Sequence, residues 1–579
     1  MGASTTLNQL IRDTTEDYLD NLDEDALPDQ IEHDLLARVN RAIEKYNMGP
    51  EDPTASANAK SYVRFPDQKP KDERARKLQA LTPAQIAQII AKRHQACRLA
   101  TVGENADKDY DMLGLYQSEG DNEGIYVASE DDFHTIARKY NYGLKDKDFK
   151  EIMSALRDMV PRRALNSDPD LVAVNNGILN YATKELMPFS PEYVFMTKSH
   201  VDFVHDAPNP VIHNDEDGTD WDVVSWMDDL SDDPEIVELL WQILGAIVRP
   251  RVSWNKSAWL YSTVGNNGKG TLCALMRNLC GAGAYASIPL KDFGQDFMLE
   301  PLTHASAIIV DENDVGTYID QAANLKAVIT NDVISINRKY KSPIAYQFHG
   351  FMVQCMNEFP KVRDRSGSFY RRQLFIPMEK RFEGRERKYI KSDYLARKEV
   401  LEYVLWHVLG ETDYYELKIP AACEAVLAEY KVFNDPCREF FKELEENATW
   451  DLLPFSFIWD AYVGWIRKNN PQGKPLGRYV LLREIKQLAA ASDIFYYDPS
   501  EPQYTARGRM DAPEPAIAEL DLKAWMDTTY SGNDLSRKCS PRNLSKSYRG
   551  LIRKAPPDDD ATDPDLGTNQ DNAQEGGDE

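Results

Sequence analysis

The stretch STVGNNGKGTL, at residues 262–272, decides how the rest of the chain is interpreted. It resembles the phosphate-loop pattern G-x-x-x-x-G-K-[ST], in which Gly268 and Lys269 fill the Gly-Lys positions. Two positions depart from this pattern, because Thr263 stands in place of the first glycine and Gly270 stands in place of the hydroxyl residue. The pattern alone does not establish a phosphate site, so the flanking sequence has to decide.

The flanking sequence is that of a strand followed by a helix. SAWLYSTV (257–264) is an apolar strand, and apolar residues recur at helical spacing from Leu272 to Leu279 until Gly281 ends the pattern. In this setting, glycines let backbone N–H groups converge on an anion at the positive end of the helix, and the lysine can reach the β- and γ-phosphates. The alternative is a glycine turn before an ordinary helix. The nucleotide-binding residues predicted here are Gly265, Asn266, Asn267, Gly268, Lys269, Gly270 and Thr271.

Polar residues end two further apolar strands. ASAIIVDEND includes Asp311 and Glu312 about forty residues after the loop, and FMVQCMN ends in Asn357. At the carboxyl edge of a parallel sheet, one carboxylate can hold Mg²⁺ and the next can polarise the attacking water, while an amide can sense the γ-phosphate. The alternatives are ordinary loop acids and an asparagine that starts a turn.

Two clusters of cations lie in the same region. Arg371 and Arg372 precede a strand, where a guanidinium supplied to a neighbouring subunit would stabilise a transferring phosphoryl group; the alternative is an exposed ion pair. VISINRKYKSPIAYQF (333–348) has two β-type runs around a basic turn. Such a hairpin can contact phosphates and stack on a base, or it can be a solvated turn. The DNA-contacting residues predicted here are Arg338, Lys339, Tyr340 and Lys341.

Composition sets limits on the class of protein. The chain has 579 residues, 42% apolar and 28% charged, which are the values of a soluble globular protein with several domains. The net charge of -26 argues against an overall cationic coat, so a nucleic-acid surface must be local. Seven cysteines without a C-x-x-C indicate neither a disulfide framework nor a zinc site. With no signal peptide and no apolar run of about 20 residues, we expect a cytoplasmic protein that does not bind membranes.

The sequence pattern predicts an α/β protein. Thr82-Pro83 starts a helix, LVAVNNGILNY reads as a hairpin, and DDPEIVELLWQILGAIV is a capped apolar helix. DKDYD (107–111) places Asp107, Asp109 and Asp111 close together, and we interpret it as a polar loop rather than a metal site. The expected segments are an acidic helical arm and linker (1–80), an α+β region (81–245), a central α/β domain (246–400), a mainly helical region that resembles a winged helix (401–550) and a disordered acidic tail (551–579).

The order of these motifs between Thr263 and Arg372 resembles that of the superfamily 3 helicases, in particular the poxvirus and phage/plasmid primase-helicase branch. KAVITNDVISINRKYKSP and FMVQCMNEFPKVRDRSGSFYRRQLFIP are similar to the central signature of that branch. VNNGILN and DPEIVELLWQILGAIV are similar to the domain before the motor, and DPCREFFKEL with WDAYVGWIRKN to its C-terminal winged helix. The resemblance covers roughly residues 90 to 500.

This resemblance implies a ring-forming, usually hexameric P-loop ATPase of the AAA+ type that moves along a DNA strand with ATP and Mg²⁺. The implied roles are phosphate binding for Lys269 and Thr271, Mg²⁺ binding for Asp311 with Thr271, water activation for Glu312, phosphate sensing for Asn357, a finger acting in trans for Arg371 or Arg372, and a pore hairpin for Arg338 to Lys341.

The two departures from the loop pattern have different consequences. Thr263 asks a β-branched residue to take a conformation that glycine usually supplies. Gly270 removes the hydroxyl that normally touches Mg²⁺, which leaves coordination to Asp311, waters and Thr271. Nucleoside monophosphate kinases share a G-K-G-T loop and bind nucleotide, so the variant is viable.

We therefore hypothesise an ATP-dependent DNA helicase for replication of a phage, plasmid or mobile element in a bacterial cytoplasm. Because the N-terminal region is too short for a polymerising domain, we expect a helicase without primase activity of its own. A separate primase or replication initiator is the partner to look for. One alternative is a small-molecule phosphotransferase, which leaves the basic hairpin and the paired arginines unexplained. The other is a non-enzymatic origin-binding or assembly protein locked by ATP, against which the pair Asp311-Glu312 argues.

Overall fold

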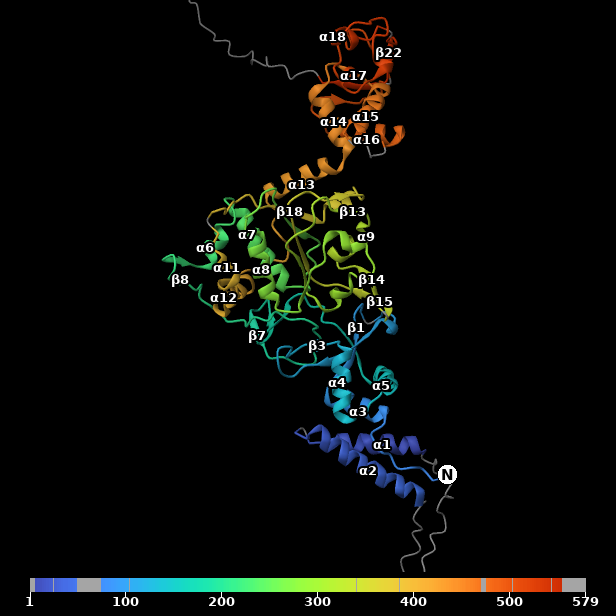
Figure 1. Cartoon of the computed structure of the whole chain (residues 1–579), viewed down its shortest axis with the longest axis vertical. Helices are drawn as coiled ribbons and strands as arrows, with labels where there is room; N and C mark the ends of the chain where they lie inside the picture. The colour runs from blue at the N-terminus through green and yellow to red at the C-terminus, as the bar shows by residue number, and fades with distance from the viewer. Residues whose placement is uncertain are drawn as a thin grey trace, which may run out of the picture. The chain divides into compact units, whose positions relative to one another are not determined.

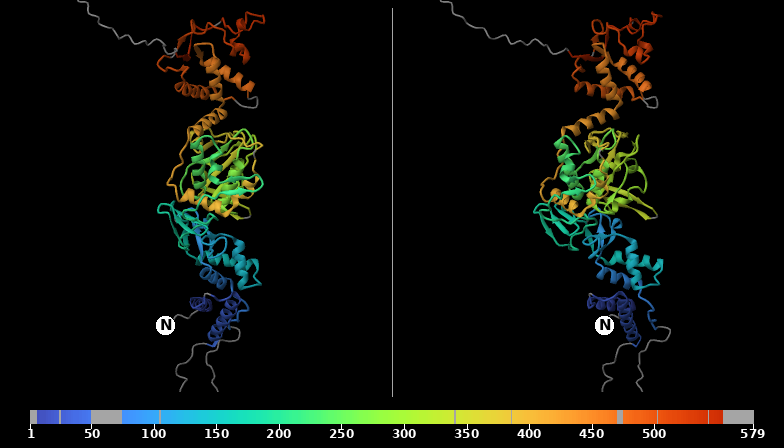
Figure 2. Two further views of the ribbon diagram at one scale, coloured as in Figure 1. Left: turned by 90° about the vertical axis from the view of Figure 1, so that its left-hand side faces the viewer. Right: turned by 60° about the vertical axis from the view of Figure 1, so that its left-hand side comes forward.

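The computed structural model describes residues 6–23, 25–48, 74–103, 105–339, 341–384, 386–469, 475–501, 503–542 and 544–554. The expected linker at 49–73 and the expected acidic tail from 555 onward lie outside the described residues. The chain divides into two compact units, Met1–Tyr430 and Lys431–Glu579, and each is described by itself (Figures 1 and 2).

Five helices and a four-stranded sheet form the N-terminal part of the first unit. α3 begins where the sequence predicts, because Thr82 caps it and Gln85 completes a reciprocal capping box. The sheet has the order β3-β2-β1-β4, and apolar residues of all five helices share one core with β1 and β2, so the packing continues across the boundary expected at residue 80. These elements are α1 (Leu7–Asp20), α2 (Pro28–Met48), α3 (Pro83–Arg93), β1 (Ala96–Ala100), β2 (Met112–Tyr116), β3 (Tyr126–Val127), α4 (Glu130–Tyr140), α5 (Asp146–Met159) and β4 (Arg162–Ala164).

A set of short strands and two helices leads from this part into the central domain. The predicted hairpin at LVAVNNGILNY is confirmed, since β5 pairs with β6 in antiparallel register from Leu171↔Asn180 to Val174↔Gly177. The apolar helix that follows is also confirmed, with Asp233 as its N-cap. The elements are β5 (Leu171–Val174), β6 (Gly177–Asn180), β7 (Glu185–Met187), β8 (Ile212–Asn214), β9 (Thr219–Trp221), α6 (Val223–Asp228) and α7 (Pro234–Val248).

The central domain is built on a five-stranded sheet with the order β11-β12-β16-β10-β18, in which every neighbouring pair is parallel. Parallel strands need crossover connections, and the helices of this segment supply them. The predicted α/β class therefore holds for this region. The elements are β10 (Ser257–Tyr261), α8 (Lys269–Cys280), β11 (Tyr285–Ala286), β12 (Ala307–Val310), β13 (Tyr318–Ile319), α9 (Ala322–Ile329), β14 (Val333–Arg338), β15 (Lys341–Gln347), β16 (Phe351–Met356), β17 (Lys361–Val362), α10 (Gly367–Tyr370), β18 (Gln373–Pro377), α11 (Lys388–Ser392), α12 (Lys398–Leu409) and α13 (Ala421–Asn434).

Both faces of the sheet are covered, as a parallel sheet requires. Along β10, Ala258 and Leu260 belong to the core shared with α7, α8 and α12, whereas Trp259 belongs to the core shared with α9 and the β14–β15 hairpin. Figure 1 shows α7 and α8 on one side of the sheet and α9 and the hairpin on the other. Strands buried on both faces explain why these segments read as continuous apolar runs in the sequence.

The second unit contains helices around a small antiparallel sheet of order β19-β23-β20, and one core joins α14, α15 and α16 to this sheet. The mainly helical character expected after residue 401 is seen here, since WDAYVGWIRKN lies within α15 and a second helix, α16, follows it. The resemblance to a winged helix stays a prediction. The elements are α14 (Pro436–Asn447), β19 (Leu452–Pro454), α15 (Phe455–Asn469), α16 (Arg478–Ala490), β20 (Phe495–Tyr496), β21 (Tyr504–Thr505), α17 (Ala516–Glu519), α18 (Leu535–Lys538), β22 (Ser547–Tyr548) and β23 (Gly550–Arg553).

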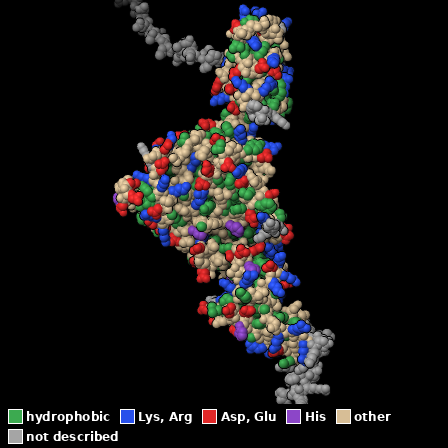
Figure 3. All heavy atoms as spheres, viewed as in Figure 1, with side chains coloured by type: hydrophobic (Ala, Val, Ile, Leu, Met, Phe, Trp, Pro, Cys, Tyr) green, Lys and Arg blue, Asp and Glu red, His purple; other side chains and the backbone are tan. Residues whose placement is uncertain are grey.

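Acidic and basic side chains are interspersed over the face shown in Figure 3. The net charge of -26 is therefore not gathered into one acidic patch on that face.

Candidate functional site

The predicted phosphate loop connects β10 to α8. Two of its residues take the left-handed backbone conformation, Asn266 with φ 54° and Gly268 with φ 85°, and Gly268 is the N-cap of α8. Thr263 is not among the residues with positive φ. The expectation that Thr263 must adopt a glycine conformation is therefore wrong, because the turn is made three and five residues later, by Asn266, whose side chain tolerates it, and by Gly268.

The conformation of the loop is fixed by a hydrogen bond within it and by side chains that pack against it. Asn267 is buried, and its Nδ2 donates to the carbonyl oxygen of Val264 at 2.6 Å. A Cβ atom at Gly268 would lie 2.7 Å from Cδ2 of Leu230 and 3.6 Å from Cε2 of Phe382. The φ angle favours glycine at position 268, and a larger residue would also have to displace the Leu230 side chain.

The sheet order brings four of the predicted site residues together. Because β10, β16 and β12 are adjacent and parallel, their carboxyl ends share one edge, where Lys269, Asn357 and the Asp311-Glu312 pair follow. Nζ of Lys269 donates a hydrogen bond to Oδ1 of Asn357 at 2.9 Å. Burial lowers the pKa of the Lys269 ammonium, and the nearby Glu312 carboxylate works against this shift. Because burial removes part of its hydration, the Lys269 ammonium at this position favours the binding of an anionic ligand.

Asp311 has a partner that the sequence did not reveal. Its carboxylate forms an ion pair with the guanidinium of Arg277, with 2.8 Å between Oδ1 and Nη2, and this contact lowers the pKa of Asp311. Arg277 lies eight residues after Lys269 on α8, and no pattern in the sequence links it to Asp311. Glu312 is exposed beside this pair.

Asn313 is a second residue that the sequence did not single out. It is buried, and its Nδ2 donates to Oε1 of Gln354 at 2.9 Å and to the carbonyl oxygen of Cys355 at 3.0 Å. Its Oδ1 accepts from the amide of Leu290 at 2.9 Å. These bonds fix the end of β12 against β16, and so they position the acidic pair relative to Asn357.

The segment after β18 forms one wall of a cavity of about 620 Å³ beside the loop. The amide of Phe382 donates to the carbonyl oxygen of Asn266 at 2.8 Å, and Nδ2 of Asn266 donates to Oε1 of Glu386 at 3.0 Å. The opposite wall comes from α6 and the turn after it, and a cavity of this size accommodates a small organic ligand. The lining residues include Trp226, Leu230, Gly268, Thr271, Phe382 and Lys391.

Arg371 and Arg372 lie at the opposite edge of the sheet. The amide of Ser257, the first residue of β10, donates to the carbonyl oxygen of Arg372 at 2.8 Å, whereas the loop follows the last residue of β10. Five residues of strand separate the two edges by about 13 Å. Neither arginine is placed to reach a ligand on the loop of its own chain. Arg371 is exposed, whereas Nη1 of Arg372 donates to Oγ of Ser368 at 2.7 Å.

The predicted basic hairpin is an antiparallel pair with an irregularity between Ile336 and Arg338. Its apolar side chains at alternate positions belong to the core that the hairpin shares with α9 and Trp259. This packing holds the hairpin against the central sheet. Lys339 is exposed. Arg338 is half-buried rather than exposed at the tip, and burial lowers its pKa. Tyr340 and the side chain of Lys341 lie outside the described residues.

The acidic loop DKDYD is structural. Asp111 is buried, and its Oδ2 lies 2.8 Å from Nε of Arg162 and 3.2 Å from Nε of Arg98. Within the described ranges, no cluster of three or more His, Cys, Asp or Glu side chains could hold a metal ion. All seven cysteines are buried, and none of them forms a disulfide.

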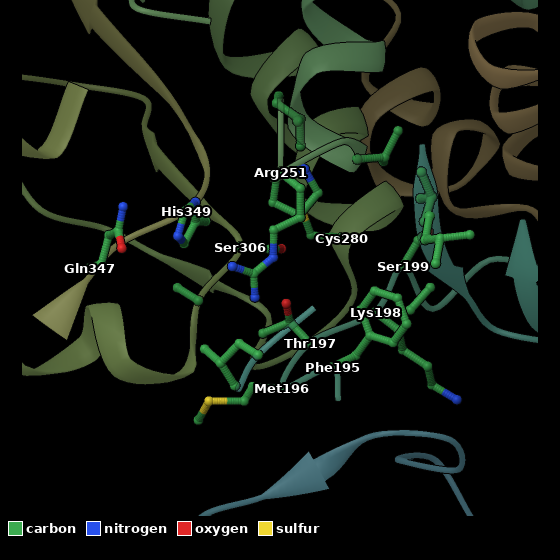
Figure 4. Close-up of a pocket in the computed structure, with 18 of the residues that line it drawn as sticks. Phe195, Met196, Thr197, Lys198, Ser199, Arg251, Cys280, Ser306, Gln347 and His349 are labelled. Atoms are coloured by element: carbon green, nitrogen blue, oxygen red, sulfur yellow. The ribbon is translucent and has the colours of Figure 1, made fainter. Parts of the chain in front are cut away.

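A second cavity lies at the amino-terminal edge of the sheet and measures about 40 Å³, so it has room for water but not for a nucleotide. Figure 4 shows the Arg251 side chain pointing into this cavity near Thr197, with His349 on the other side. Burial, followed by the charge of Arg251, lowers the pKa of His349 to about 3. His349 is therefore neutral in the folded protein at neutral and mildly acidic pH.

The depressed pKa of His349 predicts how stability depends on pH. The unfolded chain binds a proton near the ordinary pKa of 6.5 and the folded chain does not, so stability is lost as pH falls from 6.5 towards 3. Between pH 7 and pH 5 this one group removes about 2 kcal/mol. We expect that in the His349→Gln variant the free energy of unfolding, measured by urea unfolding, no longer falls by this amount between pH 7 and pH 5. The control variant His205→Gln, which changes an exposed histidine, should keep the parental pH dependence. Equal pH dependence in both variants would contradict this assignment.

Comparisons with known proteins identify two regions of the chain. Residues 5–243 match the family model described as D5 N terminal like, and residues 260–372 match a family of unknown function (DUF5906). The second match begins in β10 and ends at Arg372, so it spans the loop, the acidic pair, the hairpin and Asn357. Among curated proteins, none matches the chain.

Within the described ranges, no helix is both long enough and apolar enough to span a bilayer.

Solved structures of the NrS-1 C-terminal region are similar to the chain at low identity. Two apo structures of its A form are 15% and 14% identical, cover 82% of this chain and 100% of their own, and give TM-scores of 0.41. A third apo structure is 15% identical, covers 67% of this chain and 94% of its own, and gives a TM-score of 0.38. TM-scores of this size leave the fold to be argued from the elements of the chain itself.

The fold and the site define an α/β protein with a glycine loop, a lysine, an amide and two carboxylates at one edge of a parallel sheet. Residues 5–243, which match the family model described as D5 N terminal like, precede this domain.

Proposed function

We propose that the chain is the motor of an ATP-dependent DNA helicase of the superfamily 3, AAA+ type that acts in DNA replication. The hydrogen bond between Lys269 and Asn357, 2.9 Å long and next to the Asp311-Glu312 pair, carries this proposal. A cation, an amide and two carboxylates that converge from three strands on the amino end of a helix are the parts that phosphoryl transfer requires. The D5 N terminal like region supports the primase-helicase branch.

The residues present fit ATP with Mg²⁺. α8 offers the N–H groups of its first turn to an anion, and Lys269 adds a desolvated cation. At the carboxyl edge of the central sheet, two carboxylates and the Thr271 hydroxyl could contribute oxygen ligands. These are too few to fill the coordination sphere of a metal ion without help from a ligand or water. Mg²⁺ suits such a site, because it is usually held by one or two carboxylates together with phosphates and water. When bound, Mg²⁺–ATP supplies the phosphoanhydride bond and part of the charge that offsets its phosphates.

Each side chain then has one task. Lys269 binds the β- and γ-phosphates, and Asn357 holds the Lys269 ammonium in place. Glu312, exposed beside Asp311, would accept a proton from the attacking water, and the Asp311 carboxylate, whose two oxygens both contact the Arg277 guanidinium, would hold Mg²⁺. Arg371 acts on a nucleotide held by a neighbouring subunit, because it lies at the far edge of its own sheet.

We further propose a homohexameric ring around single-stranded DNA. Because Arg371 of one subunit acts on the nucleotide of its neighbour, each ATP site is complete only between two subunits. Hydrolysis at these sites can therefore move the β14–β15 hairpins of the subunits relative to one another. Lys339 with Lys341 contacts the DNA backbone, since cations at a hairpin tip bind phosphates without reading sequence. A separate primase or replication initiator works with the ring in this proposal.

Strand displacement on a forked DNA tests the proposal. We expect the parent to unwind with ATP and Mg²⁺, Lys269→Ala to lose both hydrolysis and unwinding, and Lys339→Ala to keep hydrolysis but lose at least tenfold of the unwinding rate. Lys418→Ala, an exposed lysine paired with Glu238, is the matched control and should behave as the parent.

Hydrolysis that DNA does not stimulate, together with no unwinding by the assembled protein, would contradict the helicase proposal. It would favour the phosphotransferase or the ATP-locked assembly protein.

A further inference from the structure

Gly270 leaves an open space at the amino end of α8, and one side chain faces it. A Cβ atom at Gly270 would have a single heavy atom within 4 Å outside its own helix backbone and chain neighbours, which is Nζ of Lys391 at 3.5 Å. In the usual loop pattern this position carries a serine or threonine. The chain thus has no side chain at position 270 and an ammonium group beside the gap.

Lys391 is held near this gap by its own segment. It lies on α11, and Ile390 next to it belongs to the core of the domain. The same segment is tied to the loop through the backbone hydrogen bond from Phe382 to Asn266. Lys391 and Thr271 line the same cavity. Lys391 is exposed, and within the described ranges its ammonium has no hydrogen-bond or ion-pair partner, so its charge is available to a ligand.

The Lys391 charge also reaches the acidic side of the site. The pKa of Asp311 is lowered mainly by its hydrogen bond to Arg277 and by the charge of Arg277. The charge of the Lys391 ammonium lowers it further. One cation therefore stands near both the amino end of α8 and the carboxylate that follows β12.

We propose that Lys391 is a phosphate-binding residue that compensates for the side chain missing at position 270. Its ligand is the phosphate chain of a nucleoside di- or triphosphate, so the inference rests on the proposed function. An ammonium in place of a hydroxyl changes the chemistry of the loop. The hydroxyl of the usual pattern is a neutral group that coordinates Mg²⁺, whereas an ammonium attracts phosphate by its charge without a metal. Nucleotide binding should then depend less on Mg²⁺ than in a loop with serine at this position.

Binding measured by calorimetry on the full chain, with ATP and with inorganic tripolyphosphate in the absence of Mg²⁺, tests the proposal. We expect Lys391→Met to weaken both ligands by the same factor, about tenfold, as loss of a charge-assisted hydrogen bond predicts. Lys391→Arg should restore most of the affinity. Lys398→Met, which removes an equal charge outside the cavity, should leave both affinities unchanged.

A double substitution tests the coupling to the gap. We expect Gly270→Ser to weaken ATP binding without Mg²⁺, because its side chain crowds the ammonium, and to have little further effect in the Lys391→Met background. Independent effects of the two changes would overturn the coupling.

The failure of this inference is distinguishable from failure of the proposed function. If Lys269→Ala abolishes ATP binding while Lys391→Met does not change it, Lys391 is not a phosphate ligand and the nucleotide site stands. A loss for ATP without any loss for tripolyphosphate would also overturn the inference. If the parent binds neither ligand, the proposed function and this inference fall together.

Discussion

Arg371→Ala is expected to lower the rate of ATP hydrolysis by a factor of about 10³ or more, the range found for arginine fingers. Arg371 is exposed and lies at the amino-terminal edge of the sheet, so its guanidinium is free to enter the site of a neighbouring subunit. Arg372→Ala should cost less activity, because Arg372 is partly buried and its guanidinium already donates to Ser368. Steady-state hydrolysis by the assembled protein measures both effects.

Mixing experiments separate a finger from a structural arginine. Arg371→Ala and Glu312→Gln are each expected to be inactive alone. In a mixed ring, a subunit that keeps Glu312 can receive Arg371 from its neighbour, so activity should reappear in the mixture. If mixing restores no activity while both variants assemble normally, Arg371 does not act in trans.

The elements of the central domain could be predicted from the sequence because their signals are local. Strands buried on both faces appear as apolar runs, and a polar residue marks the carboxyl end of each. The loop, the acidic pair and Asn357 were therefore found separately. Their meeting at one edge follows from the strand order, in which β16 lies between β10 and β12 although it comes last of the three in the chain.

The missed residues act through contacts between distant segments. Arg277 looks like any cation in the last turn of a helix until α8 and β12 are placed side by side. Lys391 lies more than a hundred residues after Gly270, and nothing in the local pattern links them. The Thr263 expectation was wrong for a related reason. The motif gives the position of a glycine, but the backbone can make its turn elsewhere, as Asn266 and Gly268 do.

Glu312→Gln is expected to reduce hydrolysis by about 10²–10⁴-fold, the usual contribution of a positioned general base, while ATP binding is retained. The change removes the proton acceptor and keeps the shape of the side chain. Because Glu312 is exposed, its loss should not unfold the protein. Asp311→Asn is less informative, since it also breaks the ion pair with Arg277.

The matched control for Glu312 is Asp314→Asn. Asp314 is also exposed and follows the same strand, but it is paired with Lys291. We expect this variant to hydrolyse ATP at nearly the parental rate. The sharpest result is a Glu312→Gln protein that assembles with ATP and binds DNA but does not turn over, because it separates the chemical step from ring formation. A Glu312→Gln protein with the parental rate would instead show that the water is activated elsewhere, and would leave the 2.9 Å contact between Lys269 and Asn357 as a binding feature without a catalytic role.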